Sequence, residues 1–355
     1  MRIAFIGDGS LGHIRRWAGY FHDRKHEVLL LSFEDIEGCP FPAVLIPRHL
    51  PTKLAGYLAS LPIIRRHIDR FRPDIVNSLY VTGYGLIGSL VNRRPLVVSA
   101  LGSDMLVDFP SSRIHRVQIR RALGAADLVT TDADNLTEAV IAAGAAREDT
   151  IKIIFGIDQS VFYPSETRIP SRDGGLHVIS TRNLYDIYNL DLLVDAAKVV
   201  LSTTDASFTI CGDGPEKERL FRKVADLGID DRFDFAGRLA PEEIAERLRA
   251  SDIYVSTSRS DSTSVSLLEA MACGNIPVVT DIPANREWIE PETNGFLVPV
   301  DSPEELARTI LEASDDREKT VEIRNRNSDI ILERGIWIEN MRKLEGAFED
   351  LLKTR

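Results

Sequence analysis

The feature that most constrains the fold is a regular alternation of short apolar segments with helical patterns, which occurs twice along the chain. The first series comprises RIAFIG, EVLLLSF, DIVNSL, PLVVSAL, DLVTT and IKIIFG, and the second comprises LHVISTR, SFTICG, FDFAG, DIYVSTS, IPVVT and GFLVPV. Apolar runs of this length between helical patterns are typical of buried parallel strands joined by crossover helices. The sequence therefore predicts an α/β protein with two doubly wound parallel sheets.

A segment rich in proline, glycine and charge, residues 163–175, separates the two series and is expected to link two domains. We place the N-terminal domain at residues 1–165 and the C-terminal domain at residues 166–335. A chain of 355 residues is long enough for two domains of the usual size. Residues 336–355 carry apolar side chains at helical spacing. They predict a C-terminal helix, with a return to the N-terminal domain as an open alternative.

The location of the protein can be predicted from its apolar runs and its cysteines. No apolar run approaches the ~18 residues that span a bilayer, and the first residues, MRIAFIGDG, are typical of a strand and turn rather than of a signal peptide. We therefore expect a cytoplasmic protein. Cys39, Cys211 and Cys273 are too scattered for a disulfide framework or a Cys-x-x-Cys metal site, and the seven histidines show no metal-ligand spacing. No metal is predicted.

The formal net charge of −11 argues against a general nucleic-acid-binding protein. Its distribution is uneven, because residues 1–165 carry 19 basic and 17 acidic side chains whereas the remainder carries 24 and 37. Basic residues gather at positions 65–72 and 113–121. These two segments are either solvated helix faces or a surface that meets an anionic acceptor or the anionic inner face of a membrane.

A glycine motif follows the first predicted strand: Gly7, Gly9 and Gly12 have the spacing G-x-G-x-x-G, and Glu34 and Asp35 follow the second strand. Taken alone, this is the fingerprint of a dinucleotide site. Glycines at a helix N-terminus let backbone amides approach any phosphate, so a sugar nucleotide would use the motif as well as NAD does. Gly9 and Gly12 are therefore candidate phosphate-binding residues, with a purely structural tight turn as the alternative.

The turns after the second series of strands hold the other candidates, because ligands of open parallel sheets bind at the carboxyl ends of the strands. Arg182 follows the first of these strands, and its planar guanidinium suits a diphosphate. Gly212 and Gly214 follow the next strand in the sequence GDGP. We interpret them as a tight turn that lines the same site.

The densest group of polar residues is SRSDSTSVSLLEAMACG, directly after the predicted strand DIYVST. Asp261 ends a loop, Ser264 is a helix-capping residue, and apolar residues follow at helical spacing. A helix N-terminus with small residues suits a phosphate or a sugar hydroxyl. Glu269, one to two turns into the helix, could accept hydrogen bonds from a ribose diol. The alternative is an ordinary capped helix.

At these residues the chain resembles the family-4 glycosyltransferases, which are retaining enzymes of the GT-B fold. Their signature is a pair of acidic residues separated by seven others, here Asp261 and Glu269, with Asp in place of the more usual first Glu. Other similar segments are the turn at 9–12, GSD at 102–104, FGIDQSVFYP, Arg182, GDGP, Gly237 with Arg238, and NGFLVP. The resemblance covers nearly the whole chain and implies two Rossmann-like domains that face each other across a cleft.

The resemblance also implies a role for each candidate residue. Arg182 would bind the donor diphosphate, Glu269 the ribose and Asp261 the transferred sugar, and these three would form the catalytic set. The backbone around Arg238 and Leu239 would bind the base. Further donor contacts would come from Gly9, Gly12, Tyr188, Gly212, Gly214 and the backbone amides of Ser264, Val265 and Ser266. The acceptor side would include Gly102, Ser103 and Asp104.

The implied activity is transfer of a hexose from a UDP- or GDP-sugar to a sugar, glycan or lipid-linked acceptor, as in cell-surface polysaccharide biosynthesis. Family members retain the anomeric configuration and use no metal or other cofactor. Two positions depart from the family pattern, because Ile187 and Tyr188 stand where a lysine usually follows the arginine, and Leu101 replaces a histidine before GSD. The Tyr188 hydroxyl is a candidate replacement for the lost phosphate contact.

Three rival hypotheses remain. An NAD-dependent oxidoreductase rests on the N-terminal glycines alone, and no tyrosine is followed by lysine at the fourth position. A metal-dependent GT-A transferase could use Asp132 and Asp134, but that segment is better explained as a helix start. A non-catalytic sugar-binding subunit of a glycan-synthesis complex is compatible with the departures at Leu101 and Ile187.

Overall fold

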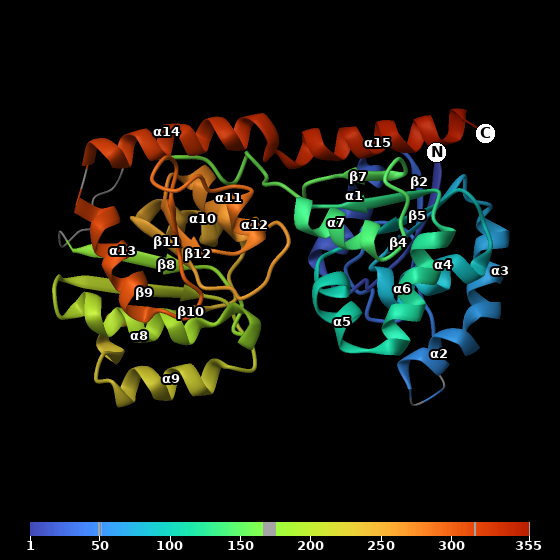
Figure 1. The fold of residues 1–355 in the computed structure, drawn as a ribbon. Helices are drawn as coiled ribbons and strands as arrows, with labels where there is room; N and C mark the ends of the chain where they lie inside the picture. Colours follow the sequence, from blue (N-terminus) through green and yellow to red (C-terminus); the bar gives the residue numbers. More distant parts are fainter. Residues whose placement is uncertain (49, 51, 166–174, 316, 355) are drawn as a thin grey trace. The chain divides into compact units, whose positions relative to one another are not determined.

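The protein is described by a computed structural model that covers residues 1–48, 50, 52–165, 175–315 and 317–354. Most of the segment expected to link the domains, 163–175, lies outside the described residues. The chain forms two compact units (Figure 1). Unit 1 consists of Met1–Ile153 with Met341–Arg355, and unit 2 consists of Ile154–Asn340.

Unit 1 contains a seven-stranded parallel sheet with the order β3-β2-β1-β4-β5-β6-β7. Its strands are β1 (Arg2–Ile6), β2 (Glu27–Ser32), β3 (Ala43–Leu45), β4 (Ile75–Leu79), β5 (Leu96–Ser99), β6 (Leu128–Thr131) and β7 (Thr150–Lys152). Its helices are α1 (Gly12–Asp23), α2 (Lys53–Ala59), α3 (Leu61–Phe71), α4 (Leu86–Val91), α5 (Phe109–Ser111), α6 (Arg113–Ala125) and α7 (Asp134–Ala142). Two π-helical turns, η1 (Val81–Gly85) and η2 (Asp104–Asp108), follow β4 and β5. The strand order reverses between β1 and β4, so the loops after these two strands flank a switch point, where open sheets bind ligands.

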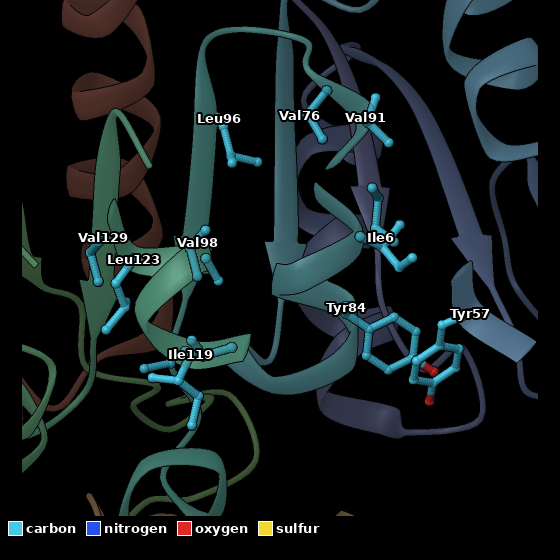
Figure 2. Packing of buried hydrophobic residues seen from close by; sticks show 14 of the residues in the cluster. Ile6, Tyr57, Val76, Tyr84, Val91, Leu96, Val98, Ile119, Leu123 and Val129 are labelled. Atoms are coloured by element: carbon cyan, nitrogen blue, oxygen red, sulfur yellow. The ribbon is translucent and has the colours of Figure 1, made fainter. Parts of the chain in front are cut away.

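The core of unit 1 lies between this sheet and its helices. Figure 2 shows Ile119 and Leu123 of α6 close to Val98 of β5 and Val129 of β6, and all four are at most 3% exposed. On another part of the sheet, Figure 2 shows the rings of Tyr57 and Tyr84 side by side, with their centroids 5.8 Å apart. Apolar contacts of this kind are the main source of the stability of the unit.

The last helix, α15 (Trp337–Lys353), packs its C-terminal part against α1 within unit 1. The ring of Phe348 stacks on Phe21 with centroids 5.2 Å apart. Glu345 accepts hydrogen bonds from the Tyr20 hydroxyl at 2.8 Å and bonds His26 at 2.7 Å. The sequence therefore returns to its first domain after unit 2 is complete.

Unit 2 contains a six-stranded parallel sheet with the order β10-β9-β8-β11-β12-β13. Its strands are β8 (Leu176–Ser180), β9 (Ala206–Cys211), β10 (Phe233–Gly237), β11 (Ile253–Ser256), β12 (Ile276–Thr280) and β13 (Phe296–Val298). Its helices are α8 (Leu190–Leu201), α9 (Lys217–Asp226), α10 (Pro241–Ala250), α11 (Val265–Cys273), α12 (Pro283–Arg286), α13 (Pro303–Asp315) and α14 (Arg317–Arg334), with 3-10 turns η3 (Asp186–Tyr188) and η4 (Asp230–Arg232). The strand order reverses between β8 and β11. Residues that follow these two strands therefore meet at a second switch point.

The prediction of two doubly wound parallel sheets is confirmed. Every predicted apolar segment contributes a strand, and the sheet of unit 1 gains the short edge strand β3, which the sequence pattern did not reveal. Within the described part of the chain, no helix is both long enough and apolar enough to cross a bilayer.

Candidate active site

Arg182 is the centre of a polar cluster at the switch point of unit 2, two residues after β8 ends. Its side chain is only 7% exposed. Nη2 donates to Oδ2 of Asp261 at 2.7 Å, and Nη1 donates to Oγ of Ser264 at 2.7 Å. The guanidinium also lies over the ring of Tyr188, 4.0 Å from its centroid. Its third nitrogen, Nε, is buried and has no hydrogen-bond partner among the residues that the structure describes.

The electrostatics of the cluster preserve the ion pair. Burial is the largest single influence on Arg182 and opposes its charge, but Asp261, Tyr254 and Tyr188 together outweigh it, so the pKa of the guanidinium is raised. Burial raises the pKa of the Asp261 carboxyl, and the charge of Arg182 and the amide of Ser262 counteract part of that effect. An arginine stays protonated in proteins, so the site presents a fixed, oriented cation.

Helix α11 begins beside this cation. Ser264 is its N-cap, and its Oγ accepts the Leu267 amide at 3.4 Å as well as the bond from Arg182. The first amides of a helix, here those of Val265 and Ser266, have no partner within the helix and point toward its N-terminal end. Because the helix dipole places partial positive charge there, this end and Arg182 together favour an anion. Glu269 lies in the next turn and is half-buried.

The GDGP turn after β9 supports the loop that carries Arg182. A Cβ added to Gly212 would lie 2.5 Å from the Arg182 carbonyl oxygen, and one on Gly214 would lie 2.3 Å from the Leu184 carbonyl oxygen. The Leu184 amide donates to the Asp213 carbonyl at 3.1 Å. These glycines therefore allow a close backbone approach, which agrees with their interpretation as a tight turn beside the site.

Three other predicted donor residues lie at the same edge of the sheet. Tyr188 is in η3 and contacts Arg182 through its ring face, whereas the sequence suggested a role for its hydroxyl. Its backbone carbonyl accepts the Thr257 hydroxyl at 2.8 Å, which ties η3 to the loop after β11. Arg238 and Leu239 follow β10, two strands away from β8, and Arg238 is exposed. Strands are ~4.8 Å apart, so these two residues are placed about 10 Å along the edge from Arg182.

The glycine turn of unit 1 is more structural than its motif suggests. The Gly9 amide donates to Ser32 Oγ at 2.9 Å, so this amide is already used. A Cβ on Gly9 would lie 2.9 Å from Ile36, whereas one on Gly12 would meet nothing within 4 Å. Gly9 is thus required by packing against the loop after β2. Of the two predicted phosphate-binding glycines, only Gly12, at the start of α1, presents open space.

The GSD segment is divided between the surface and the core. Ser103 is exposed and its hydroxyl bonds the Tyr80 hydroxyl at 2.9 Å, whereas Asp104 is completely buried. The Asp104 carboxylate accepts the backbone amides of Val81 at 2.7 Å, Leu101 at 3.2 Å and Met105 at 3.1 Å. Burial raises its pKa to about 6, although these amides favour the ionised form. The expected contact of Asp104 with an acceptor is therefore corrected: the carboxylate fastens the loops after β4 and β5 to each other. Gly102 is buried beside it.

A cluster of polar side chains near Asp104 was not predicted from the sequence. Asp108 Oδ2 accepts hydrogen bonds from the Thr82 hydroxyl at 3.0 Å and the Tyr80 hydroxyl at 3.3 Å. Tyr80 has a backbone φ of +94°, which is rare for a bulky residue and frequent at functional sites. Tyr80 directly follows the strand segment DIVNSL, so the rule that ligands bind after strands could have found it.

The segment proposed by the GT-A hypothesis begins a helix. Asp134 is the first residue of α7, and its Oδ1 accepts Lys152 Nζ at 2.6 Å. Among the described residues, no three His, Cys, Asp or Glu side chains gather in a way that could hold a metal ion.

Comparisons with known proteins identify families and relatives that this chain resembles. Residues 166–329 match the family model "Glycosyl transferases group 1", and residues 2–133 match "Glycosyl transferase 4-like". The N-acetyl-alpha-D-glucosaminyl L-malate synthase of Bacillus anthracis is 24% identical over 76% of this chain and 71% of its own length. The D-inositol 3-phosphate glycosyltransferase of Acidothermus cellulolyticus is 28% identical over 86% of this chain and 73% of its own.

Solved structures show the same fold. Anabaena HepE in complex with UDP-glucose superimposes with a TM-score of 0.84 at 22% identity, and the match covers 99% of this chain and 100% of that one. A sucrose-phosphate synthase from Thermosynechococcus elongatus superimposes with a TM-score of 0.85 at 16% identity over 100% of both chains. Taken with the two family models, these likenesses show that the chain belongs to the group 1 glycosyltransferases of the GT-B fold.

Proposed function

We propose that the chain transfers a hexose from a UDP-sugar to a sugar, glycan or lipid-linked acceptor, with retention of the anomeric configuration and without a metal. The observation that carries this proposal is the buried Arg182 at the N-terminal end of α11. A fixed guanidinium beside open helix amides suits the negatively charged diphosphate of a sugar nucleotide. UDP is favoured as the nucleotide because the similar HepE structure was determined with UDP-glucose.

In this proposal, each residue of the cluster acts on one part of the donor. Arg182 and the amides of Val265 and Ser266 hold the diphosphate and stabilise the charge that grows on it as the sugar leaves. Glu269 accepts hydrogen bonds from the ribose. Asp261, whose side chain is 17% exposed, pairs with Arg182 through Oδ2 and accepts a hydrogen bond from a hydroxyl of the transferred sugar.

The proposed chemical step forms a bond between the acceptor oxygen and the anomeric carbon while the bond from that carbon to the phosphate oxygen breaks. Attack occurs on the face from which the phosphate leaves, so the configuration is retained. The acceptor proton passes to a phosphate oxygen of the leaving UDP. Tyr188 supports this step through Arg182, because its ring fixes the plane of the guanidinium.

The first test of the proposal is the hydrolysis of UDP-sugars by the purified chain, with and without EDTA. We expect UDP binding and slow release of hexose from UDP-glucose to persist in EDTA, because Arg182 and the α11 terminus neutralise the diphosphate. Calorimetry of UDP and GDP and chromatography of the released sugar are the measurements. Activity that EDTA abolishes and Mn²⁺ restores would contradict the metal-free proposal, and binding without hydrolysis would favour a non-catalytic subunit.

A second prediction separates the members of the acidic pair. Glu269→Gln should weaken UDP and UDP-sugar alike, because the ribose is present in both. Asp261→Asn should leave UDP affinity nearly intact but lower kcat/KM for the UDP-sugar by about ten- to a hundredfold, the scale of one charged hydrogen bond to a substrate. Calorimetry with UDP and steady-state kinetics with the donor give the two readouts.

The two variants serve as controls for each other, since both replace an acid by its amide within one loop and helix. Equal losses of UDP affinity in both variants would show that the residues do not address different parts of the donor. An unchanged kcat/KM in both variants would show that neither residue contacts the donor.

A further inference from the structure

Helix α6 carries an unusual surface on unit 1. Its thirteen residues, RIHRVQIRRALGA, include four arginines and no acidic side chain. The arginines are Arg113, Arg116, Arg120 and Arg121, and all four are exposed. Within the described part of the chain, none of the four forms an ion pair. The helix therefore presents four charges that the protein does not neutralise.

Two large apolar side chains lie among these charges. Val117 is 70% exposed and Ile114 is 59% exposed. At 100° per residue, Arg113, Val117 and Arg120 occupy the middle of one face, with Ile114 at its edge. Val117 is thus apolar at the centre of the most basic part of the helix.

The opposite face of α6 is fixed in the core. Ile119 and Ala122 are 0% exposed and Leu123 is 3% exposed, and Figure 2 shows Ile119 and Leu123 directed toward the sheet. The outward face is therefore not free to rotate inward and bury its apolar residues. Gly124, in the last turn, is also exposed, and a Cβ there would meet nothing within 4 Å.

The other basic segment of the sequence lies on α3 and differs from α6 in its charges and in its exposed apolar side chains. α3 contains Asp69 among its arginines, and Arg65 donates to the Leu90 carbonyl at 2.6 Å. No large apolar side chain of α3 is among the exposed ones of the described chain. α3 therefore has the composition of a solvated face, and α6 does not.

We propose that the outer face of α6 docks unit 1 on an anionic lipid surface. The four arginines pair with lipid phosphates, and Val117 and Ile114 enter the boundary between headgroups and acyl chains, as in interfacial amphipathic helices. A nucleic acid or an anionic glycan would match the arginines but would leave the two apolar side chains in water. A second copy of the chain is disfavoured because a symmetric contact would place the arginines against one another.

The experiment is sedimentation of the full chain with vesicles of phosphatidylglycerol and phosphatidylcholine, compared with pure phosphatidylcholine, at about 0.15 M salt. We expect binding only to the anionic vesicles. Each arginine near such a surface strengthens binding about fivefold, so Arg120→Glu with Arg121→Glu should weaken it by at least about 25-fold. Arg65→Glu with Arg66→Glu on α3, an equal change of charge, should weaken it less than about fivefold.

A second matched pair of variants tests the contribution of the apolar side chains to vesicle binding. Val117→Asp should weaken vesicle binding by about tenfold or more, whereas Val321→Asp on α14, where Val321 is 55% exposed, should not. Equal losses in the α3 and α6 charge variants would overturn the proposal, as would tight binding to heparin with none to vesicles. All six substituted positions are exposed, so each variant is expected to unfold at the same temperature as the parent chain. The measurement needs no donor, so its outcome is independent of the proposed function.

Discussion

Replacement of Arg182 by alanine is expected to weaken UDP binding by roughly 2 to 5 kcal/mol, the scale for removing one partner of a buried charge pair. The side chain is only 7% exposed and supplies hydrogen bonds to Asp261 and Ser264 in addition to its contact with the ring of Tyr188. No lysine stands at the nearby family position to take over its charge, because Tyr188 and Ile187 occupy that place. Calorimetry with UDP measures the loss directly.

The same substitution should also reduce stability by about 3 kcal/mol, because it leaves the Asp261 carboxylate buried without its cation. Adding Asp261→Asn to Arg182→Ala should restore much of that stability but none of the UDP affinity. Arg259→Ala is the matched control: Arg259 lies in the loop after β11 that also carries Asp261, is 43% exposed and pairs with exposed Asp186 at 3.4 Å. Its loss should change neither quantity by more than about 1 kcal/mol. An unaltered UDP affinity in Arg182→Ala would show that this arginine does not contact the diphosphate.

The architecture was accessible from the sequence because buried parallel strands have a simple pattern. Runs such as IPVVT and EVLLLSF are apolar over most of their length, and each forms a strand that is almost entirely buried. β3 was missed because its three residues, Ala43–Leu45, are partly exposed at the edge of the sheet. A segment this short contains too little periodicity to distinguish it from a loop.

The candidate site of unit 2 could be located because the strand ends of a doubly wound sheet collect polar residues. The structure brings Arg182, Asp261 and Ser264 together, as the switch-point rule predicts. The ion pair between Arg182 and Asp261 was not foreseen, since the sequence assigns each of them to a different part of the donor. Pairing of side chains 79 residues apart depends on the geometry of two loops, which spacing alone does not encode.

Unit 1 shows why residue type alone is a weak guide to which side chains can contact a ligand. An aspartate in a loop after a strand suggests a contact with a ligand, but Asp104 faces inward and binds three backbone amides. Its burial follows from the starts of η1 and η2: the Val81 amide is the first of η1 and the Leu101 amide lies in the loop before η2, so neither has a partner within a helix. Such turns have no clear sequence pattern. The partly exposed group of Tyr80, Ser103 and Asp108 is therefore a better candidate for contact with a ligand than Asp104 is.

The hydrogen bonds of Asp104 to backbone amides lead to a second prediction with a large effect, on the stability of unit 1. Asp104→Ala is expected to destabilise unit 1 by about 3 to 5 kcal/mol, because the amides of Val81 and Leu101 lose their acceptor and each unsatisfied group costs ~1 to 3 kcal/mol. The Met105 amide also donates to the Gly102 carbonyl at 3.0 Å and keeps that bond. Asp104→Asn keeps one carbonyl oxygen and should lose an intermediate amount, while Ser103→Ala, next to it but exposed, should lose less than about 1 kcal/mol.

Hydrogen exchange of the loops after β4 and β5 is the measurement that localises this effect, because the chain has two units and its global unfolding need not be a single transition. The folded-state pKa of Asp104, about 6, lies above that of an aspartate in an unfolded chain. The folded protein therefore binds the extra proton, and its stability falls as the pH rises from about 4 to 6. Parent and variants are best compared near pH 7.5, above both of these pKa values. In the alanine variant, the amides of Val81 and Leu101 should exchange much faster than in the parent. Unchanged exchange at both amides would show that the carboxylate does not hold the two loops together.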